Sequence, residues 1–190
     1  MHHGNRHGRS EEARLAVLHA ADDLLVEHGF ARLTIEGIAQ RAGVAKQTIY
    51  RWWPSKTDIL FEAFVTDAAE ELNPPDTGDL TRDLVTHLTM LGRFLTASDA
   101  GAVFRALTAE GQHDPALAAR LREEHLTRQR ARDRQVLERA VHRGELPAGT
   151  DLDTLVDRLV GPLYYRAIVT GQEITAAFVA ELVGATLRGT

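Results

Sequence analysis

The sequence contains no cysteine among its 190 residues. This absence excludes a disulfide framework, a thiolate zinc site and a cysteine nucleophile. No apolar run approaches the length needed to cross a bilayer, and the first ten residues, MHHGNRHGRS, lack the apolar core of a secretory signal. We therefore expect a cytoplasmic protein with no membrane partner, long enough to bury a substantial core.

Recognisable catalytic patterns are also missing. The nine histidines form no HExxH or other metal-ligand spacing, and the chain has neither a phosphate-binding glycine loop nor a GxSxG elbow. The acidic pairs Asp22-Asp23 and Glu123-Glu124 are adjacent, so their members point to different sides of a helix. The sequence predicts no metal site, no cofactor and no enzymatic activity. An enzyme that uses a helical body as its pocket is the alternative from another class.

The charge is unevenly distributed along the chain. The net charge is −5, yet residues 1–56 carry eight Lys or Arg against six Asp or Glu, and the remainder carries fourteen against twenty-one. A basic beginning on an acidic remainder suits a protein that meets phosphates with one end only. Arg6, Arg9 and three histidines in the first ten residues form either an arm along nucleic acid or a solvated tail.

Residues 33–56, LTIEGIAQRAGVAKQTIYRWWPSK, have the pattern of two short helices joined by a glycine turn and ended by proline. Thr34 can cap the first helix, and Gly43 supplies the tight turn. The second helix, from Ala45, carries amide, hydroxyl, ammonium and aromatic groups, with only Val44 and Ile49 clearly directed inward. Such a surface gains little from packing, whereas the edges of bases in a major groove offer it hydrogen bonds. The pattern predicts a DNA-reading element.

The rest of the chain predicts an all-α fold, because no segment alternates with period two. Glycine and proline divide the sequence into about nine helices, the first over residues 10–29. The fourth helix is expected to start with a capping box at Ser55–Asp58 and to end at Leu72. The stretch 73–78 is the expected boundary between a domain at 10–72 and a second domain at 79–190. The five expected helices of the second domain cover residues 79–97, 99–112, 115–143, 151–170 and 175–187.

Residues 12–64 resemble the N-terminal domain of the tetracycline-repressor (TetR) family of transcription regulators. The matching residues are Phe30, Thr34-Ile35, Ile38-Ala39, Ala42-Gly43-Val44, Thr48-Ile49-Tyr50, Pro54-Ser55-Lys56, Leu60 and Ala63-Phe64. The doubled Trp52-Trp53 departs from the family pattern of His or Tyr followed by Phe. The resemblance implies a three-helix helix-turn-helix domain followed by a helical-bundle domain for ligand binding and dimerisation.

The resemblance also implies which residues contact DNA. Lys46, Gln47 and Thr48 match positions that meet base edges, where Gln favours adenine and Lys favours guanine. Thr34, Tyr50, Trp52 and Lys56 match positions that hold phosphates, and Arg51 suits either role. An ordinary solvated helix is the alternative for the whole set. Trp53, next to Pro54, is expected to pack under the helix.

A ligand pocket in the second domain is expected from the same resemblance. In the long seventh helix, His125 and Gln129 interrupt an apolar line, and Gly161-Pro162 should kink the eighth helix. The alternatives are that this polar line faces solvent or a partner, and that the aromatic residues are plain core. The candidate pocket residues are Met90, Phe94, Phe104, His125, Gln129 and Tyr165, with Leu107, Tyr164 and Arg166 as further candidates.

The last two helices carry broad apolar faces that must be buried. They pack either in the chain's own core or, as the resemblance implies, in a two-fold four-helix dimer interface. The candidate interface residues are Leu152, Val156, Leu159, Leu163, Phe178, Leu182 and Val183.

The sequence therefore predicts a homodimeric, DNA-binding transcriptional regulator with a double-stranded operator as its partner. Within that class, the expected protein is a repressor released from a palindromic operator by a small-molecule effector. The alternative is a DNA-binding regulator that has no small-molecule effector and is controlled by its abundance or by a protein partner.

Overall fold

The computed structural model describes residues 4–189, except for the side chains of residues 4–9, 69 and 70. All regular structure in these residues is helical, which confirms the all-α fold. The elements are α1 (Gly4–His28), η1 (Phe30–Arg32), α2 (Ile35–Ala42), α3 (Lys46–Trp52), α4 (Lys56–Glu71), α5 (Leu80–Ala97), α6 (Asp99–Gly111), α7 (Pro115–Arg120), η2 (Leu121–Leu126), α8 (Thr127–Arg143), α9 (Leu152–Tyr164), η3 (Tyr165–Thr170) and α10 (Ala176–Leu187).

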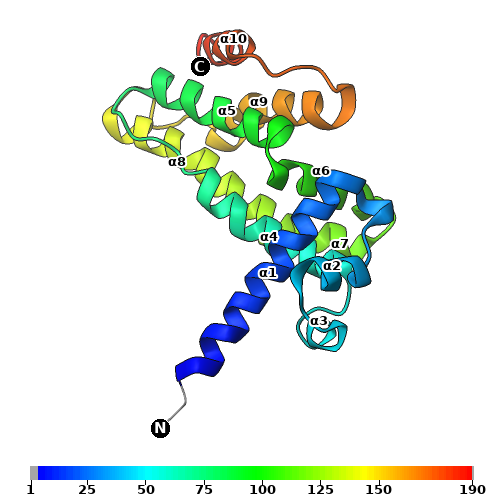
Figure 1. The fold of residues 1–190 in the computed structure, drawn as a ribbon. Helices are drawn as coiled ribbons and strands as arrows, with labels where there is room; N and C mark the ends of the chain where they lie inside the picture. The colour runs from blue at the N-terminus through cyan, green and yellow to red at the C-terminus, as the bar shows by residue number, and fades with distance from the viewer. Residues whose placement is uncertain (1–3, 190) are drawn as a thin grey trace.

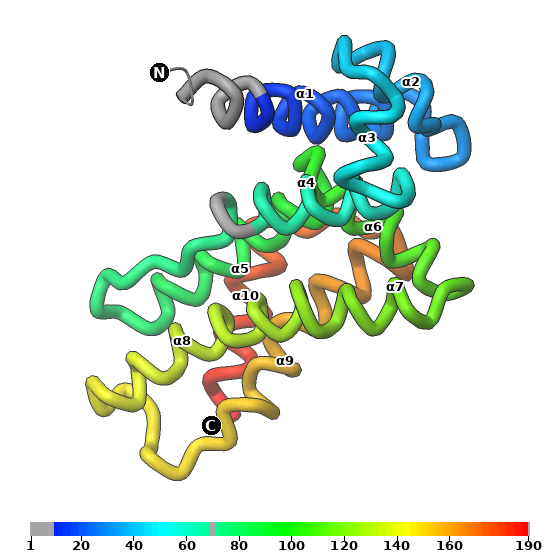
Figure 2. Tube along the Cα trace, turned by 90° about the horizontal axis from the view of Figure 1, so that it is seen from below, coloured from blue at the N-terminus to red at the C-terminus, as the bar shows by residue number. Residues whose placement is uncertain are grey.

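Two of the helices contain a π-helical segment. The π segment η2 joins α7 to α8 without a break, so that residues 115–143 form one continuous rod (Figure 2). The π segment η3 extends α9 in the same way, up to Gly171. Counted as continuous rods, the described residues form nine helices, as the sequence predicts. In this part of the chain no helix is both long enough and apolar enough to span a membrane.

The first three helices lie at one end of the molecule and α10 lies at the other (Figure 1). We call α1–α3 the head and α5–α10 the body. Helix α4 lies between them, because it packs against α1 of the head and against α6 of the body. Helix α10 packs against α5 and α9.

Helix α1 starts earlier than the sequence predicts. Ser10 was expected to cap it, but the helix begins at Gly4. A capping preference is worth only about 1 kcal/mol, so it does not force a helix to begin where the preceding residues also tolerate helical geometry. The side chains of Arg6 and Arg9 lie outside the described residues, and the arm remains a prediction.

Asp22 lies where α1 packs against α4 and α6. One of its carboxylate oxygens, Oδ1, is buried and has no hydrogen-bond partner among the described residues. Burial, together with the negative charges of Asp67 on α4, Asp23 on α1 and Asp99 on α6, raises the pKa of Asp22 to about 7. The contact between head and body therefore contains a carboxyl group that is protonated more readily in the folded chain than in the unfolded one.

The shift in the pKa of Asp22 predicts how stability depends on pH. The folded chain binds this proton more tightly, so the stabilisation is complete below pH 4 and is lost as the pH rises through about 7. We expect Asp22→Asn to raise the free energy of unfolding at pH 8 by roughly 2–4 kcal/mol and to change it little at pH 4. Urea unfolding at both pH values measures this, with the exposed neighbour variant Asp23→Asn as control. Equal effects of Asp22→Asn at the two pH values would contradict the assignment.

Candidate nucleic-acid interface

Helices α2 and α3 form a helix-turn-helix whose entry and turn are set by two residues. The Thr34 Oγ1 accepts a hydrogen bond from the backbone N–H of Gly37 at 3.1 Å, which caps α2. Gly43 ends α2 with a φ of 65°, in the left-handed region where a side chain would be strained. Its N–H donates to the carbonyl groups of Ala39 and Gln40. Both features confirm the local prediction from the sequence.

The inner face of α3 is fixed by two buried residues. Ile49 and Trp53 lie in the core, and the Trp53 indole Nε1–H donates to Glu62 Oε2 of α4 at 2.8 Å. The indole ring therefore packs beneath the helix, as predicted. The Ser55 Oγ accepts from the backbone N–H of Asp58 at 3.2 Å, which confirms the expected cap at the start of α4. Together these contacts hold α3 at a fixed angle to α4.

The outer face of α3 is left to solvent. Lys46, Gln47, Tyr50 and Arg51 are exposed, whereas Thr48 and Trp52 are half-buried. The Arg51 guanidinium lies 5.5 Å from the centroid of the Trp52 ring. The Lys46 Nζ lies 3.8 Å from a carboxylate oxygen of Glu36, and both side chains are exposed. A surface pair of this kind contributes little, so the Lys46 ammonium is available to another anion.

The hydroxyl group of Thr34 can accept one hydrogen bond and donate another at the same time. As the cap of α2, its oxygen accepts a hydrogen bond, but a hydroxyl also carries one O–H donor. The residue is exposed, and that donor is directed by rotation about a single bond. Capping α2 is therefore compatible with donation to a phosphate.

Lys56 does not share the exposure of the other predicted contacts. Its Nζ donates to the carbonyl oxygens of Phe30 at 2.7 Å and Leu33 at 3.0 Å, and lies 4.0 Å from the centroid of the Phe30 ring. The side chain is half-buried and its ammonium is turned back toward η1. These contacts fasten the segment before α2 to the start of α4, which is a structural role that the sequence did not indicate.

Helix α1 is fastened to α2 by a two-pronged ion pair. The Arg41 guanidinium donates to both carboxylate oxygens of Glu27, at 2.9 and 2.7 Å. This hydrogen bonding lowers the pKa of Glu27 and raises that of Arg41. Arg41 is thereby engaged within the head, and the basic groups left exposed on the helix-turn-helix lie on α3.

Comparison with known proteins identifies both parts of the chain. The family model "Bacterial regulatory proteins, tetR family" matches residues 17–63, and "Tetracyclin repressor-like, C-terminal domain" matches residues 74–186. The chain belongs to the TetR family. Regulators of this family bind DNA and act as dimers, and they are not enzymes.

Relatives cover nearly the whole chain. The HTH-type transcriptional regulator YdeS of Bacillus subtilis is 39% identical over 181 residues, which are 95% of this chain and 91% of YdeS. The DNA-binding transcriptional repressor TetR of Mycobacteroides abscessus is 29% identical and covers 92% of each chain. The crystal structure of the TetR family regulator SCO0332 superposes with a TM-score of 0.78 at 34% identity, covering 94% of this chain and 98% of that one.

The body of this TetR-family chain contains a pocket between α6, the α7–η2 segment and the α9–η3 segment. Its volume is about 420 Å³. The pocket thus lies between the seventh and eighth helices of the sequence prediction, where a cavity was expected. Its walls are formed by Phe104, Thr108, Gly111, Gln112, Ala118, Leu121, Arg122, Leu126, Tyr164 and Ile168.

Of the nine candidate pocket residues, Phe104 and Tyr164 line this pocket. Met90 and Phe94 line a separate, smaller cleft beside Glu71 and Arg93. Tyr165 is 58% exposed and does not line the pocket. The neighbouring Tyr164 lines it instead, because one residue along a helix rotates the side chain by about 100°.

His125 and Gln129 are buried in the core rather than placed along the pocket. The His125 ring lies between aromatic rings, with centroids 4.3 Å from Phe64 and 5.7 Å from Phe104. Burial and the positive charges of Arg132 and Arg128 lower the pKa of His125 to about 4, so the ring is neutral at pH 7. His125 therefore packs as a neutral ring in the aromatic core and does not face the pocket.

Gln129 belongs to a buried polar cluster at the centre of the body. Its Nε2 donates to Asp133 Oδ1 at 2.9 Å, and the same oxygen lies 2.7 Å from His87 Nε2 of α5. All three residues are almost completely buried. This cluster ties α8 to α5. Gln129 is thus held by hydrogen bonds within the fold and does not face the pocket.

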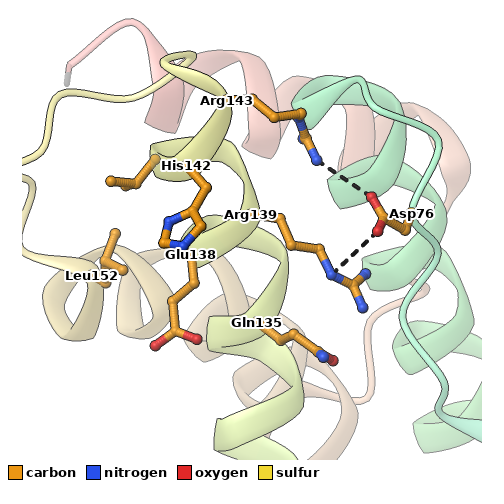
Figure 3. A pocket seen from close by; sticks show the side chains of 8 residues that line it. Asp76, Gln135, Glu138, Arg139, His142, Arg143 and Leu152 are labelled. Atoms are coloured by element: carbon orange, nitrogen blue, oxygen red, sulfur yellow. Dashed lines mark hydrogen bonds and ion pairs between the residues drawn. The ribbon is translucent and has the colours of Figure 1, made fainter.

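A second, open groove lies at the far end of α8 (Figure 3). There Arg139 and Arg143 both point toward Asp76, at N–O distances of 3.5 and 3.3 Å. Arg143 also contacts Glu145 at 2.5 Å. The two arginines of this groove are thus paired with carboxylates of the fold, and Glu138 is paired with Arg134.

The predicted dimer residues divide into two groups. Leu152, Val156, Leu159, Leu163 and Val183 are buried in the chain's own core, so the apolar stripe is largely hidden without a partner. Phe178 and Leu182 are only half-buried. A charge placed at Leu159 or Val183 would therefore disrupt folding before it reported on dimerisation. The exposed apolar residues of this region are Tyr165, Ile168 and Val169, on η3.

The contrast between Lys56 and Lys46 can be tested directly. We expect Lys56→Met to lower the free energy of unfolding by about 1–3 kcal/mol, because the partly buried carbonyl groups of Phe30 and Leu33 lose a charged donor. The salt dependence of DNA binding should stay unchanged. Lys46→Met should leave stability unchanged and weaken binding to the matched operator by about 1–3 kcal/mol, because a donor to a base edge is lost. Urea unfolding and DNA titrations between 50 and 200 mM salt measure both quantities. A loss of about one unit in the slope of log K against log salt for Lys56→Met would place Lys56 on the phosphates.

Proposed function

We propose that this protein is a homodimeric repressor that binds a palindromic operator and releases it when a small molecule enters the pocket of the body. The observation that carries this proposal is a direct connection between that pocket and the start of α4. Arg120 is the last residue of α7, and the next residue, Leu121, begins the π segment that lines the pocket.

Arg120 contacts α4 in two ways. Its guanidinium donates to Asp58 Oδ1 at 2.7 Å and lies 4.0 Å from the centroid of the Phe61 ring. The backbone N–H of Asp58 donates to the side chain of Ser55, which caps α4. Ser55 lies three residues after Trp52, where α3 ends. A ligand that displaces η2 thus acts on the first turn of α4, which holds the recognition helix.

The exposed groups of α3 are suited to separate tasks. The Gln47 amide offers a donor and an acceptor together, which pairs with adenine in the major groove, and Lys46 donates to guanine. The hydroxyl groups of Thr34 and Tyr50 donate to phosphates, which fixes position without carrying sequence information. The identity of the operator therefore depends on few side chains.

Two heads are needed to bind a palindrome, with recognition helices about 34–36 Å apart. We place the dimer contact on the outward face of η3, where Tyr165 and Val169 are exposed, and on α10, where Phe178 and Leu182 are half-buried. Exposed apolar side chains that lie close together are typical of a protein–protein contact. A ligand that favours a different separation of the heads by a few kcal/mol is sufficient to release DNA.

Selection from a random DNA pool tests this function. We expect the protein to enrich a palindrome whose half-sites are centred about one helical turn apart. Gln47→Ala should relax the sequence preference at one position of each half-site, at a cost of about 1–3 kcal/mol. Binding curves on matched and mismatched operators measure the effect. Enrichment of no sequence would refute operator recognition, and equal loss on every sequence would move Gln47 to the phosphate backbone.

The dimer contact is tested at a residue that the protomer does not bury. We expect Tyr165→Glu to give folded monomers that bind the operator weakly, because a carboxylate would replace an apolar contact. The matched control is Val26→Glu, which introduces the same charge at an exposed apolar site on α1. Light scattering measures the mass of each variant. A Tyr165→Glu protein that stays dimeric at micromolar concentration would place the interface elsewhere.

A further inference from the structure

The pocket in the body has a composition that specifies the class of its ligand. Its volume of about 420 Å³ lies within the range of about 300–1,000 Å³ found for small-molecule sites. Most of the wall is apolar, with Leu121 and Leu126 from η2 and Ile168 from η3. Most of the ligand's surface is therefore expected to be apolar.

Two aromatic side chains of this wall favour a flat ligand. The rings of Phe104 and Tyr164 meet nearly edge to face, with centroids 6.0 Å apart. Both residues line the pocket, so a planar ring can pack against either one.

Arg122 is the one charged residue among those that line the pocket, and no carboxylate accompanies it. Within the described part of the chain its guanidinium forms neither an ion pair nor a hydrogen bond. Most other arginines of the rod are paired, such as Arg120 with Asp58, Arg130 with Asp157 and Arg134 with Glu138. An unpaired guanidinium beside an apolar wall is a binding group for a carboxylate, which it can hold through two parallel hydrogen bonds.

Tyr164 adds a neutral donor to the same wall. Its hydroxyl has no hydrogen-bond partner among the described residues. Burial and the negative charge of Asp133 raise the pKa of Tyr164 above its usual value, so the phenol stays protonated. The wall thus presents a cation and a donor, both of which suit a ligand that carries acceptor oxygens.

We propose that the pocket binds an aromatic organic acid, with its ring against Phe104 and Tyr164 and its carboxylate on Arg122. This inference rests on the proposed function, because it names the effector class for the same pocket. Since Arg122 follows directly after Leu121 and Arg120, the carboxylate would engage the chain two residues from the ion pair to Asp58. Binding would thereby act on α4.

The test uses three probes that share one ring system and differ in charge, namely 2-naphthoate, 2-naphthamide and 2-naphthylmethylammonium. Calorimetry on the full-length protein should show 2-naphthoate binding about tenfold or more tightly than the amide, with the cation weakest. Arg122→Gln should remove the preference for the acid over the amide. The matched control is Arg128→Gln, an exposed arginine of the same rod that does not line the pocket, and it should keep the preference.

Equal affinity for the three probes, or a preference for the acid that survives Arg122→Gln, would overturn the proposal. Failure of every probe to bind would overturn it as well. Operator binding, followed in the same samples by fluorescence anisotropy, separates this inference from the proposed function. If the protein binds operator but no probe, the ligand class is rejected while DNA recognition stands. If 2-naphthoate binds with the expected charge preference but leaves the operator bound, the ligand class stands and release by ligand is rejected.

Discussion

The structure depends on helix α4, which buries apolar residues against two partners, α1 of the head and α6 of the body. Ile59, Leu60, Phe61 and Phe64 are almost completely buried, between α1 of the head and α6 of the body. Because interiors are close-packed, a displacement of α4 cannot be confined to one half of the molecule. The position of the recognition helix is therefore coupled to the packing of the body.

Cationic side chains perform opposite tasks in this protein, depending on whether they are paired. Arg41, Lys56 and Arg120 are held by carboxylates or carbonyl groups, and each fastens one helix to another segment. Lys46 has only a weak surface partner, and Arg122 has none among the described residues. Pairing within the fold fixes geometry, whereas an unbalanced charge attracts an external anion. The pairing of each cation is thus a better guide to its role than its residue type.

The sequence predicted those features that depend on residues close together in the chain. The Thr34 cap, the Gly43 turn and the Ser55 cap each depend on residues at most four positions apart. Features that depend on distant segments were not accessible. The direction of Lys56 depends on carbonyl groups more than twenty residues away. Whether Leu159 and Val183 face a partner or their own core depends on how α5, α9 and α10 pack together, which a helical pattern alone leaves open.

The π segment η2 helps to explain why residues at a spacing of four all remain buried, which a regular α-helix does not predict. Leu121, His125, Gln129 and Asp133 recur every four residues, and all are buried. In a regular α-helix each such step advances by about 40° around the axis, so four residues at this spacing drift toward solvent. A π segment turns the chain less per residue and offsets that drift. Within η2, Leu121 and His125 thereby both stay inside the body, while Arg122, next to Leu121, is exposed at the pocket. The π segment η2 thus contributes residues both to the core of the body and to the wall of the pocket.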